Sequence, residues 1–127
     1  MNKKILTTGA IFALIAVLLG AFGAHGLEKL VDYKSVESFR TGVRYQMYHA
    51  IVLLILGSIL VISDTHKKRI YYFFLLGTIL FSGSIYFLVV DEVLGISLAR
   101  IAFITPIGGL LLIIGWILFV ISLMKTK

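Results

Sequence analysis

Cysteine is absent from this chain of 127 residues, and charged residues are scarce. Without cysteine the chain has no disulfide, no thiolate-bound zinc or iron–sulfur cluster and no thiol nucleophile. Only 14% of the residues are charged and 60% are apolar, whereas a soluble domain is about a quarter charged and about half apolar. Such a chain cannot cover its own surface with polar groups in water. The composition therefore excludes an ordinary soluble globular domain, and it excludes a disordered chain.

Long apolar runs predict an all-α integral membrane protein with four transmembrane helices in a single domain, residues 1–127. A helix rises about 1.5 Å per residue, so roughly 20 residues cross a hydrocarbon core of about 30 Å. Lipid offers no hydrogen-bond partner to the backbone, so runs of this length must be helical. The first run is longer than the roughly 7–15 apolar residues of a signal peptide, so we expect it to be retained. The four runs cover residues 5–24, 47–63, 70–90 and 101–124.

The distribution of cations predicts the orientation of this up-down bundle. With the N-terminus inside, seven Lys and Arg residues fall on the cytoplasmic side and five on the outer side, and the positive-inside rule favours that arrangement. The net charge of +6 is therefore explained by a membrane surface, and no nucleic-acid partner is expected. Both termini should lie in the cytoplasm of a bacterial cell. The inner cations are Lys3, Lys4, Lys67, Lys68, Arg69, Lys125 and Lys127; the outer ones are Lys29, Lys34, Arg40, Arg44 and Arg100.

The outer link between the first two runs contains an amphipathic pattern over residues 35–46. Ser35 is a candidate N-cap, and apolar residues follow it at spacings of three and four. The segment is expected either to continue into the second span or to lie on the outer membrane surface.

Proline occurs once, at position 106, inside the fourth apolar run. Two readings stay open. Either the helix begins at Pro106 and residues 93–104 form a separate interfacial or re-entrant piece, or one continuous helix is kinked at the proline. Small residues recur along the spans at helical spacing, which predicts close helix packing and allows a homo-oligomer through the same faces.

Polar residues gather in the outer half of the predicted bundle. On the second span Gly42, Gln46, His49 and Gly57 share one face, which should point inward. The outer ends of the four helices are expected to meet around one hydrophilic spot. The candidate ligand-binding residues are His25, Gln46, His49, Ser82, Ser84, Tyr86, Thr105 and Arg44.

Three roles are open for this polar cluster. Its members could hydrogen-bond one another and fix helix register, bind a lipid headgroup or small solute, or use the two histidines for metal, haem or proton relay. No acidic or cysteine ligand lies within a span to complete a catalytic metal site. The pattern contains no nucleophile elbow, phosphate loop or paired carboxylates. Arg44 is expected as an interfacial anchor, or as a partner of Glu28, Glu37 or a lipid phosphate.

Four motifs, in this order and with this spacing, resemble the YwdK-like domain-of-unknown-function 423 family. They are Gly20-Ala21-Phe22-Gly23-Ala24-His25-Gly26-Leu27, Tyr45-Gln46-Met47-Tyr48-His49-Ala50, Phe81-Ser82-Gly83-Ser84-Ile85-Tyr86 and Ile104-Thr105-Pro106-Ile107-Gly108-Gly109. The resemblance covers nearly the whole chain. It implies a small four-span protein of the plasma membrane and brings no activity or cofactor with it.

The sequence thus predicts a non-enzymatic multi-pass membrane protein without a cofactor, whose expected partners are membrane lipids. The outer polar cluster is expected to bind a lipid headgroup or small solute. The alternatives are a structural or assembly subunit of a membrane complex, and a haem- or metal-binding redox protein.

Overall fold

The computed structural model describes residues 2–95 and 101–126, and in these residues the protein is built from helices alone. Helix α1 covers Asn2–His25, a short 3-10 helix η1 covers Leu27–Lys29, α2 covers Tyr33–Ser58, α3 covers Asp64–Leu94 and α4 covers Ile104–Met124. The expected all-α class is confirmed.

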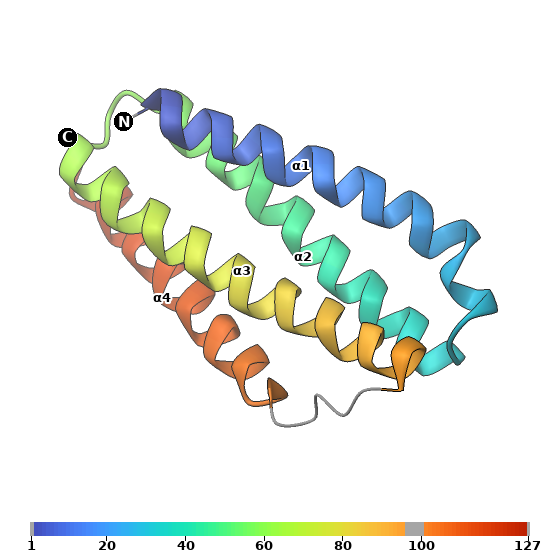
Figure 1. Ribbon diagram of the computed structural model, residues 1–127. Helices are drawn as coiled ribbons and strands as arrows, with labels where there is room; N and C mark the ends of the chain where they lie inside the picture. The colour runs from blue at the N-terminus through green and yellow to red at the C-terminus, as the bar shows by residue number, and fades with distance from the viewer. Residues whose placement is uncertain (1, 96–100, 127) are drawn as a thin grey trace.

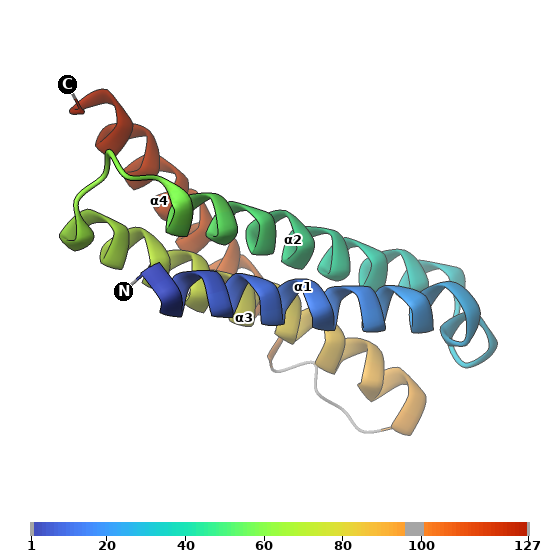
Figure 2. The ribbon, with the colours of Figure 1, turned by 90° about the horizontal axis from the view of Figure 1, so that it is seen from above.

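The four long helices run up and down, and extensive packing joins those that are adjacent in the sequence (Figures 1 and 2): α1 with α2, α2 with α3, and α3 with α4. The first and last helices lie on opposite sides of the central α2–α3 pair (Figure 1). Both chain ends and the α2–α3 link lie at one end of the molecule, which we call the termini end. The opposite end, where η1 and the end of α3 lie, is called the far end.

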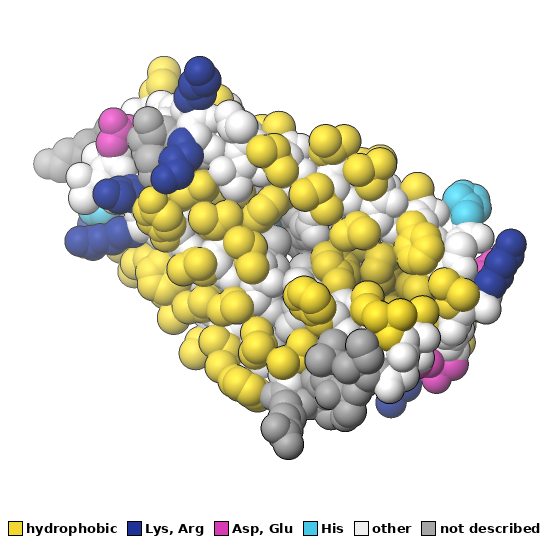
Figure 3. Space-filling model, viewed as in Figure 1, with side chains coloured by type: hydrophobic (Ala, Val, Ile, Leu, Met, Phe, Trp, Pro, Cys, Tyr) yellow, Lys and Arg dark blue, Asp and Glu magenta, His cyan; other side chains and the backbone are white. Residues whose placement is uncertain are grey.

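Three of the helices are long and apolar enough to cross a membrane: α1, α3 and α4. Their large apolar side chains are widely exposed, for example Leu14 (60%), Leu18 (61%) and Ile113 (58%). Yellow apolar side chains cover the middle of the molecule, while Lys and Arg side chains appear at its two ends (Figure 3). Helix α2 falls short of this apolarity because its first half carries Lys34, Glu37, Arg40 and Arg44.

Helix α2 is continuous, so the expected amphipathic segment 35–46 runs on into the following apolar residues. Its N-cap is Asp32, whose carboxylate accepts the backbone N–H of Ser35 at 2.8 Å. The expected N-cap at Ser35 is therefore wrong; this serine lies in the first turn instead. The helix ends at Ser58, and Ile59 has an extended backbone. Residues 59–63, expected to complete the second span, form the link to α3.

Helix α3 begins at a Ser63 cap and extends to a left-handed glycine, Gly95. Val93 and Leu94, expected in a separate piece before Pro106, are its last residues, whereas residues 96–100 of that piece lie outside the described residues. Helix α4 begins at Ile104, so Pro106 is in its first turn, where an N–H has no intrahelical partner to lose. The proline therefore lies in the first turn and does not interrupt the helix, which begins two residues earlier than the reading that started it at Pro106.

The core is apolar at the termini end, where α1, α2, α3 and α4 contribute Ile5, Leu53, Phe74 and Leu112. A second cluster at the far end joins Leu27 and Phe39 to Val89 of α3 and contains no buried residue of α4. At this end α3 extends beyond the beginning of α4. Ser84 of α3 lies level with Thr105 of α4, and ten further residues of α3 follow Ser84. A crevice is left beside the exposed end of α3.

Candidate functional site

A buried amide joins three helices in the far half of the molecule. Gln46 of α2 is 6% exposed; its Nε2 donates to the Phe12 carbonyl of α1 at 2.8 Å, and its Oε1 accepts from Tyr86 Oη of α3 at 2.7 Å. Both ends of the side chain are therefore paired. A group that is satisfied in this way fixes helix register and has little capacity left for a ligand.

Ser82 makes a second link between α2 and α3. Its hydroxyl donates to the Gly42 carbonyl at 2.6 Å. The approach depends on the glycine, because a Cβ at position 42 would lie 2.9 Å from the Tyr86 ring. The predicted inward face of α2 is confirmed, since Gly42, Gln46, His49 and Gly57 are all buried.

His49 is held from both sides of its ring. Nδ1 lies 2.7 Å from the Tyr45 carbonyl, and Trp116 Nε1 of α4 lies 3.1 Å from Nε2. A carbonyl only accepts and an indole N–H only donates, so Nδ1 carries the proton and Nε2 is the acceptor. The imidazole has no free lone pair for a metal ion or haem iron. Trp116 was not among the residues expected from the sequence.

The two histidines do not meet. Gly9 of α1 packs against Ala50, which follows His49, whereas Gly23 packs against Phe39 near the beginning of α2. His25 is exposed two residues after Gly23, so about 20 Å of helix separates it from the level of His49. Within residues 2–95 and 101–126, no three His, Cys, Asp or Glu side chains are placed to hold a metal ion.

Ser84 and Thr105 form a hydroxyl pair between α3 and α4. Thr105 also lines a cleft of about 350 Å³ between α2, α3 and the beginning of α4, which we call the Thr105 cleft. Ser35, Ser38 and Thr41 line it from α2, and α3 supplies an apolar wall of Ile85, Leu88 and Val89.

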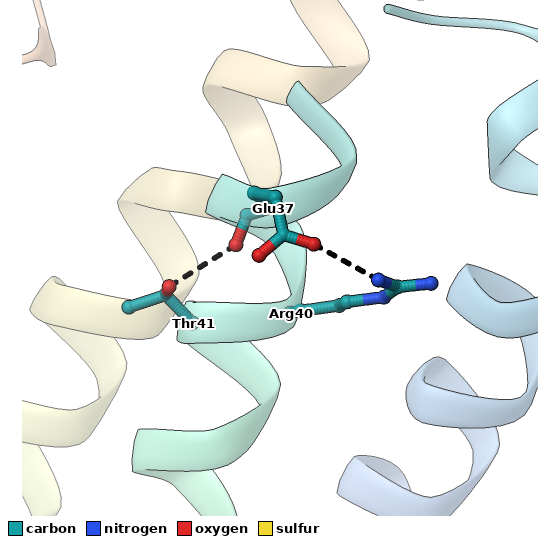
Figure 4. A network of polar contacts seen from close by, with 3 residues as sticks. All are labelled: Glu37, Arg40 and Thr41. Atoms are coloured by element: carbon teal, nitrogen blue, oxygen red, sulfur yellow. Dashed lines mark hydrogen bonds and ion pairs between the residues drawn. The ribbon is translucent and has the colours of Figure 1, made fainter. Parts of the chain in front are cut away.

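Arg44 lies on the other side of α2, in a groove of about 290 Å³ against α1 that we call the arginine groove. Its apolar lining comes from both helices: Gly20, Gly23, Phe39, Val43 and Met47. Arg40, one turn before Arg44, shares the groove, and its side chain extends from α2 toward α1 (Figure 4).

Glu37 pairs with Arg40 at 2.9 Å and not with Arg44, and its backbone carbonyl accepts from Thr41 at 3.1 Å (Figure 4). Glu37, one of the expected partners of Arg44, therefore pairs with Arg40 instead. The side chain of Arg40 is 45% exposed, and the sequence had marked it only as an outer cation. Its helical spacing from Arg44 was the available signal.

The structure thus divides the predicted cluster into separate parts. Gln46, Tyr86, Ser82 and His49 are paired inside the molecule; Thr105 and its partner Ser84 border the cleft; Arg44 borders the arginine groove; and His25 is exposed at the end of α1.

Comparison with known proteins identifies relatives over nearly the full length of the chain. Residues 19–109 match the model of a family described as a protein of unknown function, DUF423. The chain is 39% identical to the UPF0382 membrane protein YwdK of Bacillus subtilis, over 97% of this chain and 98% of the relative. It is 39% identical to a UPF0382 membrane protein of Staphylococcus epidermidis (97% of both chains) and 36% identical to one of Haemophilus influenzae (100% and 98%). No solved structure matches.

Proposed function

Because the chain belongs to the DUF423 family, whose relatives are named membrane proteins, we propose that it is a non-enzymatic four-span protein of the cell membrane that binds a phospholipid headgroup at its outer surface. In this arrangement α2 also crosses the membrane, in addition to α1, α3 and α4, and its charged first half lies at the outer interface. The termini end faces the cytoplasm, so the far end is the outer end.

The orientation is supported by the charges of the two ends. Lys3, Lys4, Lys67, Lys68 and Arg69 belong to the termini end, together with Lys125 at the C-cap of α4. Cytoplasmic segments of membrane proteins are enriched in such residues.

The observation that carries the lipid proposal is the arginine groove. It combines an apolar lining for an acyl chain with two guanidinium groups one helical turn apart, at the depth where α1 reaches its outer end. Arginine forks match phosphate oxygens geometrically. An outer-leaflet phospholipid brings a phosphate and an acyl chain to this depth, so its chemistry complements both parts of the groove.

A second candidate ligand, a small polar solute, suits the Thr105 cleft, where four residues that carry hydroxyls lie opposite an apolar wall and Ser38 is the one without a hydrogen-bond partner among the described residues. A third role, as a structural or assembly subunit, is favoured by the internal pairing of Gln46 and His49. The pairing of both His49 nitrogens argues against the haem or metal alternative.

Native mass spectrometry of the purified protein with phosphatidylglycerol tests the proposal. Replacing both arginines (Arg40→Gln with Arg44→Gln) should weaken one bound lipid about tenfold, since two charge-assisted contacts are lost. Lys34→Gln is the matched control, because Lys34 is an outer cation of α2 that does not line the groove. Unchanged lipid binding in the double variant would refute the arginine groove as the binding site. If Thr105→Val alone lost the binding of a small solute, the Thr105 cleft would be favoured instead.

Orientation is tested separately by thiol labelling, because the chain has no cysteine and hence no background. An impermeant maleimide added to intact cells should label Glu28→Cys, next to α1 at the far end, and leave Thr65→Cys in the first turn of α3 unlabelled. The opposite pattern would invert the proposed topology.

A further inference from the structure

Two adjoining pockets lie at the termini end, between the beginning of α3 and the end of α4. Their volumes are about 220 and 310 Å³, and His66, Ser122 and Lys125 line both. Arg69 lines the first, while Ser63 and Thr126 line the second. The two helices run side by side there (Figure 1), so the pockets form one continuous site, which we call the His66 site.

The site gathers cations from two helices. Arg69 comes from the second turn of α3 and Lys125 from the C-cap of α4, 56 positions later in the chain. Among the described residues, no acidic side chain lines either pocket. The fold therefore brings two positive groups around one cavity, and the lining residues that the structure describes include no acidic side chain.

Ser122 supplies a hydroxyl that is not used within the described part of the chain. The residue is 8% exposed and lines both pockets, and its Oγ has no hydrogen-bond partner in residues 2–95 and 101–126. Its backbone carbonyl, by contrast, accepts from Thr126 Oγ1 at 2.8 Å. The hydroxyl of a nearly buried residue that lines a cavity is a donor available to a ligand.

His66 is arranged as a further donor. Ser63 Oγ caps α3 by accepting the His66 backbone N–H, and the same oxygen lies 2.9 Å from His66 Nδ1. A hydroxyl oxygen can accept two hydrogen bonds and donate one, so this contact is compatible with either tautomer of the neutral ring. When the hydroxyl proton is directed to Nδ1, the ring proton is on Nε2, and that N–H is a donor for a ligand.

We infer that the His66 site binds a phosphate group, through Arg69, Lys125, the Ser122 hydroxyl and the His66 imidazole. These are two cationic and two neutral donors around a cavity whose described lining has no acidic side chain, and phosphate oxygens accept hydrogen bonds from donors of both kinds. The phosphate belongs either to an anionic lipid headgroup of the adjacent leaflet or to a small phosphate in solution. The site shares no residue with the arginine groove at the opposite end of the molecule.

The test measures both ligand sources on the detergent-purified full chain. Phosphatidylglycerol is titrated by native mass spectrometry, and inorganic phosphate is titrated by calorimetry in a zwitterionic detergent free of anionic lipid. The variants are Arg69→Gln combined with Lys125→Gln, and Ser122→Ala. The matched control is Lys68→Gln, a cation next to Arg69 in the sequence that does not line the site. Thermal unfolding of each variant verifies that the fold is kept.

We expect the double variant to weaken the ligand about tenfold and Ser122→Ala to weaken it about threefold. Lys68→Gln should leave binding unchanged. Saturable binding of inorganic phosphate would assign a soluble ligand, whereas binding of phosphatidylglycerol alone would assign a lipid.

The inference is overturned if neither probe binds, or if a folded double variant binds as tightly as the original chain. The arginine groove is tested by different substitutions, so the two proposals can fail separately. If the Arg40/Arg44 double variant loses lipid binding but the Arg69/Lys125 double variant binds normally, the His66 site alone is rejected. If only the Arg69/Lys125 double variant loses binding, the arginine groove alone is rejected.

Discussion

Trp116 donates a hydrogen bond from Nε1 to Nε2 of His49 across 3.1 Å, linking the last helix to the second. Their rings also meet edge to face, with centroids 6.0 Å apart. Helix α4 otherwise packs mainly on α3, so this polar pair is its specific tie to α2. It also gives the unprotonated nitrogen of His49 a donor inside the molecule.

Removing the indole donor should therefore destabilise the fold. Trp116→Phe leaves His49 Nε2 buried without a donor, and we expect a loss of about 1–2 kcal/mol in the free energy of unfolding. Thermal or SDS unfolding in detergent measures it. His49→Phe and the double variant complete a mutant cycle, whose coupling should be about 1 kcal/mol. A coupling near zero would mean that the bond contributes nothing.

The tyrosine on α3 gives a second measurable link. Tyr86→Phe removes the donor to Gln46 Oε1 and should cost about 1 kcal/mol of unfolding free energy. Tyr48→Phe is the matched control, because Tyr48 is 50% exposed and has no side-chain hydrogen bond in the described part of the chain. Equal effects of the two substitutions would contradict a specific role for Tyr86.

Gly108 is expected to tolerate no side chain. A Cβ there would lie 2.3 Å from the Phe81 backbone nitrogen, and backbone cannot move aside as a flexible side chain can. Gly108→Ala should force α3 and α4 apart at a cost of about 1–3 kcal/mol. Gly83→Ala on α3 is the control, since its Cβ would meet nothing within 4 Å. Unfolding midpoints in detergent compare the two, and a stable Gly108→Ala protein would show that the helices pack less closely than described.

Glu92 connects the ends of two helices at the far end. Its carboxylate accepts from the Asp32 backbone N–H at 3.3 Å and from the Ser35 hydroxyl. Glu92→Ala should loosen the first turn of α2 and raise amide hydrogen exchange over residues 33–38 by about three- to tenfold. Asp91→Ala, its sequence neighbour, should leave that exchange unchanged. If both variants showed identical exchange, the Glu92 carboxylate would not be what holds the first turn of α2.

The helices could be predicted because lipid imposes one solution on a long apolar run. The ends of the helices are harder to predict. Residues 59–62 continue the apolar run of α2, but the helix itself ends at Ser58 because the backbone of Ile59 is extended. Either Asp32 or Ser35 could cap α2 by composition, and only the backbone conformation identifies Asp32.

For the candidate site, helical periodicity identified the buried face of α2 correctly. It could not identify the partners of that face, because the Phe12 carbonyl and Trp116 belong to other helices and no sequence spacing relates them to Gln46 or His49. The His66 site was missed for the same reason, since Arg69 and Lys125 become neighbours only when α3 and α4 pack.

Helix α3 contains 31 residues and so measures about 46 Å, roughly 16 Å more than the hydrocarbon of a bilayer. If α3 crosses the bilayer near its normal, this surplus is shared between the polar residues 64–69 at its beginning and the last residues around Glu92. In the proposed orientation the contact of Glu92 with Asp32 and Ser35 then lies at the outer headgroup layer, where it holds the beginning of α2 to the end of α3.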